Sequence, residues 1–332
     1  MAGSLDHGGD LSAARRLFPN AREPFVDLST GINPFPYPIP EFSHKDLTRL
    51  PDAARVERLT EIAAHWYGAP SRLGVVAAPG TQILLPMVAA LAPRGRAVVL
   101  APTFSEHMRA AALAGHIAAE VSDANQLRQA NLAVVVNPNN PDGRIVARET
   151  LLSIADDLNK RRGVLVVDEA FADAAPKAIS LADHDRDNIV VLRSFGKFFG
   201  LAGLRLGFAL TSAALAKRLA AQLGPWAISG PAMTIAEKAL KDSAWRDATL
   251  QSLERASTSF DQMLTASGLK IVGGTPLFRL TDSPNADALF RRLGRAGILV
   301  RSFADHPTWL RWGLPRHEAE LQRLQAALAR DA

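Results

Sequence analysis

The chain has 332 residues, of which 48% are hydrophobic and 21% are charged, and it contains no cysteine. These are the proportions of an ordinary globular protein, so they exclude wholesale disorder. The lack of cysteine excludes disulfides, thiolate metal sites and cysteine nucleophiles. The length favours one large domain accompanied by a smaller one.

The formal net charge of +5 arises from 38 basic and 33 acidic side chains spread along the whole chain. No basic block with interleaved aromatic residues is present, so we expect no nucleic-acid binding, and small anionic ligands fit the charge better. The histidines are scattered without metal-ligand spacing, and we expect no metal. No apolar run is long enough to span a membrane, and MAGSLDHGGDLSAARR lacks a signal core, so we expect a cytoplasmic protein.

The predicted elements begin after an irregular segment. Residues 33–40 read NPFPYPIP, which excludes a regular helix or central strand and predicts an ordered arm or a linker. Helical spacing of apolar residues follows over 47–67. Up to about residue 210, Ala/Leu-rich helical segments then separate short β-branched runs, which are GVVAA, AVVLAP, LAVVVN, GVLVVDEA and NIVVLRSF. This alternation predicts a mostly parallel sheet with crossover helices, an α/β fold.

The last third of the chain has a different pattern. A long helical pattern covers 231–264, and shorter signals follow: strands at 269–272 and 276–280, a helix at 286–296, the strands GILVRSF and TWLRWGL, and a helix from 317. We expect a smaller α+β domain there, with the first residues packing against it or reaching a partner subunit. The expected parts are 1–46, the arm and part of the small domain; 47–225, the large domain; and 226–332, a connecting helix and the small C-terminal domain.

The stretch SFGKFFGLAGLRLG, residues 194–207, is the most informative in the chain. Its Lys197 follows the predicted strand NIVVLR and so lies at the carboxyl edge of a parallel sheet, where open α/β folds bind ligands. A partly desolvated amine there can form a Schiff base, although a solvated turn lysine is the plainer interpretation.

Two further segments support a ligand site. Asn140 lies in VVVNPNNPDG, where a strand runs into a proline-rich turn, and Asp168 ends the strand VLVV. A carboxylate that is buried at such a position needs a cationic partner, and a protonated pyridine nitrogen is one. Asn140, Asp168 and Lys197 follow successive predicted strands.

In this order, NPNNPDG, VVDEAF and SFGKFFGLAGLRLG resemble the fold-type-I pyridoxal-phosphate enzymes of the histidinol-phosphate aminotransferase-like branch. The resemblance covers nearly the whole chain and implies an aspartate-aminotransferase-like large domain that binds pyridoxal 5'-phosphate. Softer features, HGGDL and VDLSTGINPFPYP in a short chain, are similar to the L-threonine O-3-phosphate decarboxylases of cobalamin biosynthesis.

The resemblance implies roles for individual residues. Lys197 would carry the cofactor and then move protons, and Asp168 would keep the pyridine nitrogen protonated. Asn140 would donate to the ring phenolic oxygen, while Ser194 and Arg205 would bind the cofactor phosphate.

A second set of cofactor residues lies nearer the N-terminus. Gly80, Thr81 and Gln82 match the phosphate loop, since a Gly turn that opens a helix presents backbone N–H groups to an anion. Phe104 is the expected ring-stacking residue, with His107 as a second candidate or an ordinary polar helix residue.

The resemblance also implies substrate contacts. Arg311 would bind the substrate α-carboxylate and Arg301 would be a second cation beside it, with a structural ion pair as the alternative for both. A phosphorylated substrate needs more donors, and the candidates are His7, Gly31, Ile32 and Asn33, although HGG is also compatible with a disordered start.

Two departures from the family pattern stand out. Phe171 occupies the place of a tyrosine that bonds the ring oxygen in many relatives, which leaves Asn140 as the main donor. Leu50-Pro51-Asp52 replaces a Tyr-Pro-Asp whose tyrosine reaches the partner subunit's cofactor, so that hydroxyl is missing here.

The resemblance implies bond cleavage at Cα of an amino acid in a homodimeric enzyme. The expected reaction is decarboxylation of L-threonine O-3-phosphate to (R)-1-aminopropan-2-yl phosphate. The same residue types also serve transamination, so a histidinol-phosphate or related aminotransferase remains an alternative. A non-catalytic protein that binds a cofactor adduct is a remote one, because Lys197 and its anchors are all present.

Overall fold

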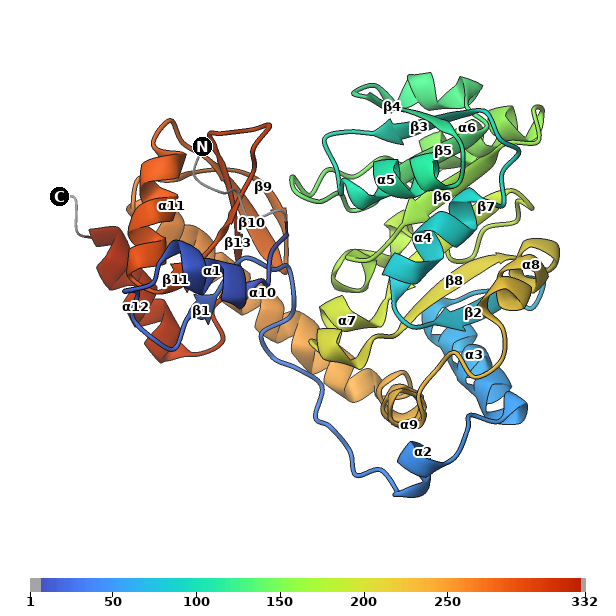
Figure 1. The fold of residues 1–332 in the computed structure, drawn as a ribbon, viewed down its shortest axis with the longest axis horizontal. Helices are drawn as coiled ribbons and strands as arrows, with labels where there is room; N and C mark the ends of the chain where they lie inside the picture. The colour runs from blue at the N-terminus through green and yellow to red at the C-terminus, as the bar shows by residue number, and fades with distance from the viewer. Residues whose placement is uncertain (1–6, 330–332) are drawn as a thin grey trace. The chain divides into compact units, whose positions relative to one another are not determined.

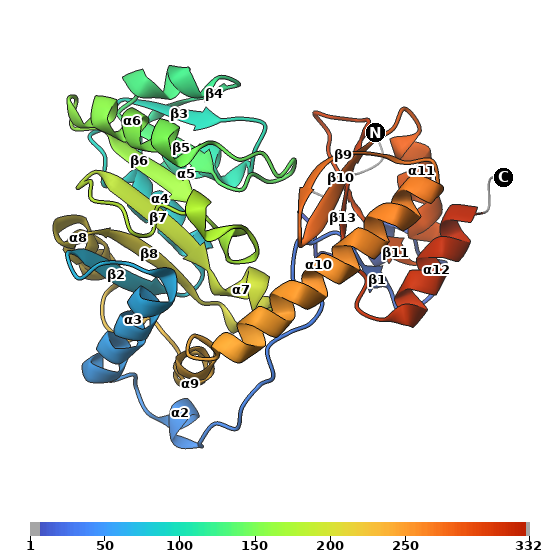
Figure 2. The ribbon, with the colours of Figure 1, turned by 180° about the vertical axis from the view of Figure 1, so that it is seen from behind.

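The computed structural model describes residues 7–329, shown from two sides in Figures 1 and 2. These residues divide into two compact units, which we call the sheet unit (36–246) and the terminal unit (7–35 with 247–329). The chain therefore passes between the units twice, after Phe35 and after Arg246. Within 7–329, no helix is both long and apolar enough to span a membrane.

The sheet unit is built on seven strands in the order β2-β8-β7-β6-β5-β3-β4. β8 is antiparallel to both of its neighbours, and every other adjacent pair is parallel. This confirms the predicted α/β fold with a mostly parallel sheet. The strands are β2 (Leu73–Ala78), β3 (Arg96–Leu100), β4 (Ile117–Val121), β5 (Leu132–Val136), β6 (Val164–Asp168), β7 (Ile189–Ser194) and β8 (Gly207–Ser212).

Helices cover both faces of this sheet. Figure 1 shows α4 (Thr81–Ala89) and α5 (Glu106–Leu113) in front of the strands, and Figure 2 shows α3 (Ala53–Tyr67) and α6 (Arg148–Asn159) on the other side. α8 (Ala213–Leu223) joins α4 and α5 in one apolar core with the strands. Every residue of β5, β6 and β7 is buried, which explains why these strands are uninterrupted apolar runs rather than alternating ones.

The remaining elements of the sheet unit are short. They are α2 (Lys45–Thr48), α7 (Phe195–Phe198) and α9 (Gly230–Ala239), with the 3-10 turns η1 (Ala124–Gln129), η2 (Ala172–Ala174), η3 (Lys177–Ile179) and η4 (Ala202–Leu204).

The terminal unit contains a four-stranded antiparallel sheet in the order β12-β13-β10-β9. Its strands are β9 (Lys270–Thr275), β10 (Phe278–Asp282), β12 (Arg301–Ser302) and β13 (Trp309–Gly313). β1 (Val26–Asp27) pairs in parallel with β11 (Ile298–Leu299), so the first residues pack in this unit, one of the two outcomes that the sequence left open. Its helices are α1 (Leu11–Leu17), most of α10 (Ser243–Ala266), α11 (Ala286–Arg295) and α12 (Glu318–Leu328).

Three predicted elements differ in the structure. The helix predicted over 47–67 begins only at Ala53, because Asp52 caps it by accepting from the backbone N–H of Arg55 at 2.8 Å. The pattern over 231–264 is two helices, α9 and α10 (Ser243–Ala266), since the chain turns at Leu240 and Asp242 accepts from the N–H of Trp245. GILVRSF forms two short strands with different partners, β11 and β12.

Candidate active site

The carboxyl edge of the large sheet collects the predicted cofactor residues. β3, β5, β6 and β7 run parallel and β2 points the same way, so the segments that follow all five strands start at this edge. These segments hold Gly80, Phe104, Asn140 and Lys197, and Asp168 is the last residue of β6. The position agrees with the general location of ligand sites in open α/β sheets.

Asp168 has a buried partner that the sequence did not reveal. Its Oδ2 lies 2.9 Å from Nε2 of His107, and the His107 and Asp168 side chains are only 3% and 7% exposed. The other carboxylate oxygen accepts the backbone N–H of Ala170 at 3.0 Å. His107 therefore holds Asp168 in one orientation. The Phe104 ring lies edge-on to His107, with the ring centroids 6.0 Å apart. Because His107 contacts Asp168, we keep Phe104 as the candidate for stacking on the cofactor ring and regard His107 as a partner of Asp168.

Lys197 lies in α7, directly after the buried β7. Its Nζ lies 5.7 Å from the centre of the Phe171 ring, which is itself buried. Phe171 thus borders the amine with an apolar face where a tyrosine would bring a hydroxyl. Ser194, also buried, precedes α7, and its side chain makes no capping hydrogen bond to that helix.

The predicted phosphate loop is built around a close approach. Gly80 has φ of +83° and opens α4, and a Cβ there would lie 2.6 Å from Nη2 of Arg205. Only glycine therefore allows the Arg205 guanidinium to reach this helix start, where backbone N–H groups point outward. Thr81 is the first residue of α4, while the Gln82 amide donates to Oε2 of Glu106 at 2.6 Å.

Hydrogen bonds tie the neighbouring loops together beside Asn140, which is half-buried. Asn139 donates to the carbonyl of Pro102 at 2.8 Å and accepts from the Thr103 hydroxyl at 2.6 Å. The backbone N–H of Asn137 donates to the carbonyl of Asp168 at 2.8 Å. The loops after β3, β5 and β6 therefore form one hydrogen-bonded frame around the edge.

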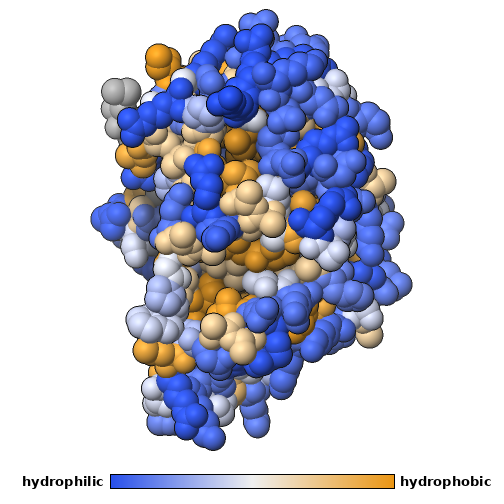
Figure 3. Space-filling view, turned by 90° about the vertical axis from the view of Figure 1, so that its right-hand side faces the viewer, coloured by the Kyte–Doolittle hydropathy of each residue, from blue (hydrophilic) through white to orange (hydrophobic). Residues whose placement is uncertain are grey.

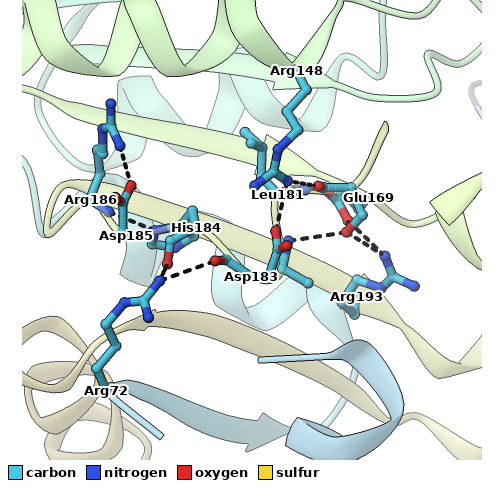
Figure 4. Close-up of polar contacts among 11 residues, drawn as sticks. Arg72, Arg148, Glu169, Leu181, Asp183, His184, Asp185, Arg186 and Arg193 are labelled. Carbon is cyan, nitrogen blue, oxygen red and sulfur yellow. Dashed lines mark hydrogen bonds and ion pairs between the residues drawn. The ribbon is translucent and has the colours of Figure 1, made fainter. Parts of the chain in front are cut away.

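A buried ion cluster lies behind the same strand ends (Figure 4). Arg193 binds Glu169, as Figure 4 shows, and it also binds Asp173, at 2.6 Å in each case; all three side chains are almost fully buried. Burial raises the pKa of Glu169, and the Arg193 cation opposes that shift. Because neighbours in a strand point to opposite faces, Asp168 and Ser194 face away from this cluster.

The same cluster fixes the segment that follows β6. Glu169 also accepts from the Ser180 hydroxyl and from the backbone N–H of Leu181, both at 2.6 Å. Further along this segment, the backbone carbonyl of His184 accepts from Arg72 at 2.9 Å (Figure 4). Burial lowers the pKa of His184 to about 4. This segment is therefore held by buried polar contacts on the face away from Asp168.

The predicted carboxylate-binding arginines lie in the terminal unit. Arg301 and Arg311 are cross-strand partners in β12 and β13. Arg311 is buried and donates to the carbonyl of Ser29 at 2.7 Å. Burial and the neighbouring Arg301 cation lower the pKa of Arg311 to about 10. Like charges directly opposite each other destabilise a sheet, so this pair favours an anionic ligand.

The N-terminal candidates gather around Ser29 in the same unit. The backbone N–H of Gly9 donates to the Ser29 hydroxyl at 2.7 Å, and a Cβ at Gly8 would overlap the Ser29 carbonyl. This is the carbonyl that accepts from Arg311. His7 is exposed beside them. The two glycines of HGG are thus packed against Ser29, which favours an ordered segment over the interpretation of a disordered start.

The GIN turn follows directly. Gly31 and Asn33 are buried and Ile32 is half-buried, and Asn33 accepts the backbone N–H of Phe35 at 2.9 Å. Leu50, at the position of the missing tyrosine, is 68% exposed.

Comparison with known proteins now identifies the family. The family model described as aminotransferase class I and II matches residues 23–328. The chain belongs to the aminotransferase class I and II family. Within it, the threonine-phosphate decarboxylase of Sinorhizobium sp is 42% identical over 99% of both chains. The threonine-phosphate decarboxylase of Pseudomonas aeruginosa is 40% identical over 98% of this chain and 97% of its own.

A solved structure agrees with the fold of this family. The histidinol-phosphate aminotransferase of Sinorhizobium meliloti, in complex with pyridoxal-5'-phosphate, matches with a TM-score of 0.83 and covers 96% of this chain and 93% of its own. At a sequence identity of 22%, this match is evidence for the fold alone.

The residues at the sheet edge fit pyridoxal phosphate as class I and II aminotransferases use it. The Arg205 guanidinium lies close to the Gly80 turn at the start of α4, and this cationic helix start suits a phosphate. The buried Asp168 carboxylate suits a protonated ring nitrogen, and the half-buried Lys197 offers an amine. The donor set thus matches the phosphate, the ring nitrogen and the aldehyde of this cofactor.

Proposed function

We propose that the chain is a pyridoxal-phosphate-dependent decarboxylase that converts L-threonine O-3-phosphate to (R)-1-aminopropan-2-yl phosphate in cobalamin biosynthesis. The choice of reaction rests on sequence identities of 42% and 40%, over almost the whole chain, to two enzymes named for this reaction. The residues at the sheet edge support the cofactor, and the paired arginines support a substrate with a carboxylate.

Pyridoxal phosphate, when bound, supplies a sink for the electron pair that is released at Cα. Asp168 holds a proton at the ring nitrogen, and His107 fixes the direction of the Asp168 carboxylate through its 2.9 Å contact. Lys197 would hold the cofactor through its aldehyde group, and its ammonium form would donate the proton that replaces the lost carboxylate at Cα. The Phe171 ring, 5.7 Å from its Nζ, gives that amine an apolar neighbour.

The proposed binding residues form three sets, one for the cofactor, one for the substrate carboxylate and one for the substrate phosphate. Arg205, Ser194 and the backbone N–H groups after Gly80 bind the cofactor phosphate, and Asn140 donates to the ring oxygen. Arg311, supported by Arg301, binds the substrate carboxylate. His7 and the turn Gly31, Ile32 and Asn33 bind the substrate phosphate. As expected from the sequence, we propose that the cofactor binds to the large α/β domain.

One assay separates this function from the aminotransferase alternative. Purified protein is incubated with O-phospho-L-threonine, and separately with histidinol phosphate, each with and without a keto acid. Carbon dioxide release from O-phospho-L-threonine without a keto acid is the expected result. Turnover that depends on a keto acid, or that occurs only with histidinol phosphate, would contradict the proposal. A colourless protein that binds no cofactor would indicate a different class altogether.

We also propose a cytoplasmic homodimer. Apolar side chains lie grouped among polar ones on the face in Figure 3. The arm and the residues after it expose Ile39, Leu47 and Leu50 at 65%, 67% and 68%, which a second copy would cover. Sedimentation at assay concentration is expected to give a dimer. An active monomer would exclude an essential partner subunit.

A further inference from the structure

The helix that carries Lys197 is too short to hold itself in place. α7 has only four residues, Phe195–Phe198, and isolated helices of that length are unstable in water. Its position must therefore come from packing. Phe195, Phe198 and the following Phe199 are each no more than 1% exposed, so three buried rings surround the lysine in the sequence.

These rings belong to one aromatic stack. The Phe195 and Phe199 rings are parallel with centroids 4.2 Å apart, and Trp245 stacks on Phe199 at 5.5 Å. Trp245 also contacts Phe198 edge-on at 5.5 Å. Figure 2 shows the corresponding elements side by side, with α7 next to the first turn of α10. Trp245 thus touches both residues that follow Lys197.

Tyr37 reaches the same place from the proline-rich arm. Its backbone N–H donates to the carbonyl of Phe199 at 2.9 Å, and its ring packs edge-on against Trp245 at 5.0 Å. Tyr37 is only 8% exposed, and burial raises the pKa of its hydroxyl, so the group stays a donor at neutral pH.

Asp242 joins Tyr37 to Trp245. One carboxylate oxygen accepts from the Tyr37 hydroxyl at 3.3 Å, and the other accepts the backbone N–H of Trp245 at 2.9 Å. Asp242 therefore caps the start of α10 and binds the arm at the same time. We call Tyr37, Asp242 and Trp245 the arm anchor.

The arm anchor lies where the chain leaves the sheet unit. The two passages between the units follow Phe35 and Arg246, so Tyr37 and Trp245 each lie within two residues of a passage. Both covalent connections are thus fastened to each other and to the segment directly after Lys197. Asp168, by contrast, ends β6 and is held by His107 and by the backbone N–H of Ala170.

We propose that Tyr37, Asp242 and Trp245 are positioning residues for Lys197, which hold its short helix by packing on Phe198 and Phe199 and make its position depend on both connections to the terminal unit. The proposal rests on the proposed role of Lys197. It predicts that loosening the arm anchor disturbs the lysine more than it disturbs the rest of the sheet edge.

The test compares Trp245→Leu with Trp245→Phe and Leu158→Ala. Leu158 is a fully buried residue of α6, so its truncation lowers stability without touching α7. Hydrogen exchange is measured on the cofactor-free proteins for the peptide that covers 195–200. We expect exchange there to rise roughly tenfold in Trp245→Leu, with peptides from β3 and β5 unchanged. Trp245→Phe is expected to restore protection, and Leu158→Ala to leave this peptide at the wild-type rate.

The holoenzymes provide a second readout. In Trp245→Leu we expect kcat to fall roughly tenfold to a hundredfold, as for a misplaced reacting group, and KM to change much less. The pH midpoint of the cofactor absorbance is expected to shift by about half a unit, since the environment of the Lys197 amine changes. Tyr37→Phe keeps the ring and removes only the hydrogen bond to Asp242, so a smaller change in the same direction is expected.

Two results would overturn the proposal. The first is that hydrogen exchange of the peptide 195–200 and the pH midpoint of the cofactor absorbance both stay at wild-type values, in Trp245→Leu as well as in Tyr37→Phe. The other is an equal change in Leu158→Ala. If Trp245→Leu does not fold, Tyr37→Phe decides alone. Failure of the proposed function looks different: borohydride would then leave no cofactor on Lys197 in the wild-type protein.

Discussion

The two units present their charged groups in opposite ways. At the edge of the large sheet, the buried Asp168 carboxylate already has His107 at 2.9 Å, and the buried Arg193 lies between two carboxylates. In the terminal unit, Arg301 and Arg311 are cross-strand neighbours of like charge, and Arg311 is buried. The buried charges of the first unit are paired with each other at close distance, whereas the second unit brings two cations together near the acidic Asp27.

This difference fits two kinds of ligand. A cofactor that stays bound through many turnovers suits a rigid site whose groups are oriented before it arrives. A substrate that comes and goes can bring an anion of its own, so its binding would lower the repulsion between the two arginines. The comparison predicts that changes in the sheet unit affect kcat most and that changes in the terminal unit affect KM most.

The largest effect is expected from Lys197→Ala. Because the amine is the only group proposed to bind the cofactor covalently and return a proton, turnover should be abolished. Borohydride treatment should no longer attach the cofactor. Lys177→Ala, at an exposed position of the same unit, is the control and should behave as wild type. Attachment to another lysine in Lys197→Ala would show that the assignment is wrong.

Asp168→Asn should come next. The protein should fold, since the side chain keeps its size, but the loss of an oriented charge should raise the activation barrier by about 3 kcal/mol or more. The measurement is kcat at saturating substrate. Asp185→Asn changes a carboxylate that is 61% exposed and should have no such effect. Near-native activity of Asp168→Asn would remove this residue from the mechanism.

A smaller effect, confined to the substrate, is expected from His7→Ala or from deletion of residues 1–9. The loss of a charge-assisted contact to the substrate phosphate should cost about 1.5–3 kcal/mol. It should appear as a raised KM for O-phospho-L-threonine with unchanged cofactor affinity. His44→Ala is the control, because His44 is also exposed. If the truncated enzyme binds this substrate as tightly as before, its phosphate lies elsewhere.

Arg301→Gln should produce the smallest change and the most specific one. Removal of a like charge opposite Arg311 should raise the free energy of unfolding of the unliganded protein by about 0.2–1 kcal/mol. The same change should raise KM, because the substrate carboxylate loses a cation. Thermal unfolding and steady-state kinetics measure the two effects, with the exposed Arg295→Gln as control. A variant that is less stable would contradict the repulsion on which the comparison depends.

Much of the sheet unit could be predicted from the sequence. The runs that became β5, β6 and β7 are apolar throughout, because helices cover both of their faces. β4 and β8 were not predicted. β4, at the edge of the sheet, is mostly not buried and has no continuous apolar run. The break between α9 and α10 was missed as well, since a single capping contact made by Asp242 produces it.

The sequence by itself was enough to propose which residues carry the chemistry, since Asn140, Asp168 and Lys197 each follow an apolar run and stand in recognisable motifs in the same order as in the family. Only the tertiary structure decided what holds them. His107 meets Asp168 across 61 residues of chain, Arg193 meets Glu169 across 24, and Tyr37 meets Asp242 across 205. Such contacts depend on strand order, register and packing, which no local pattern of residues encodes.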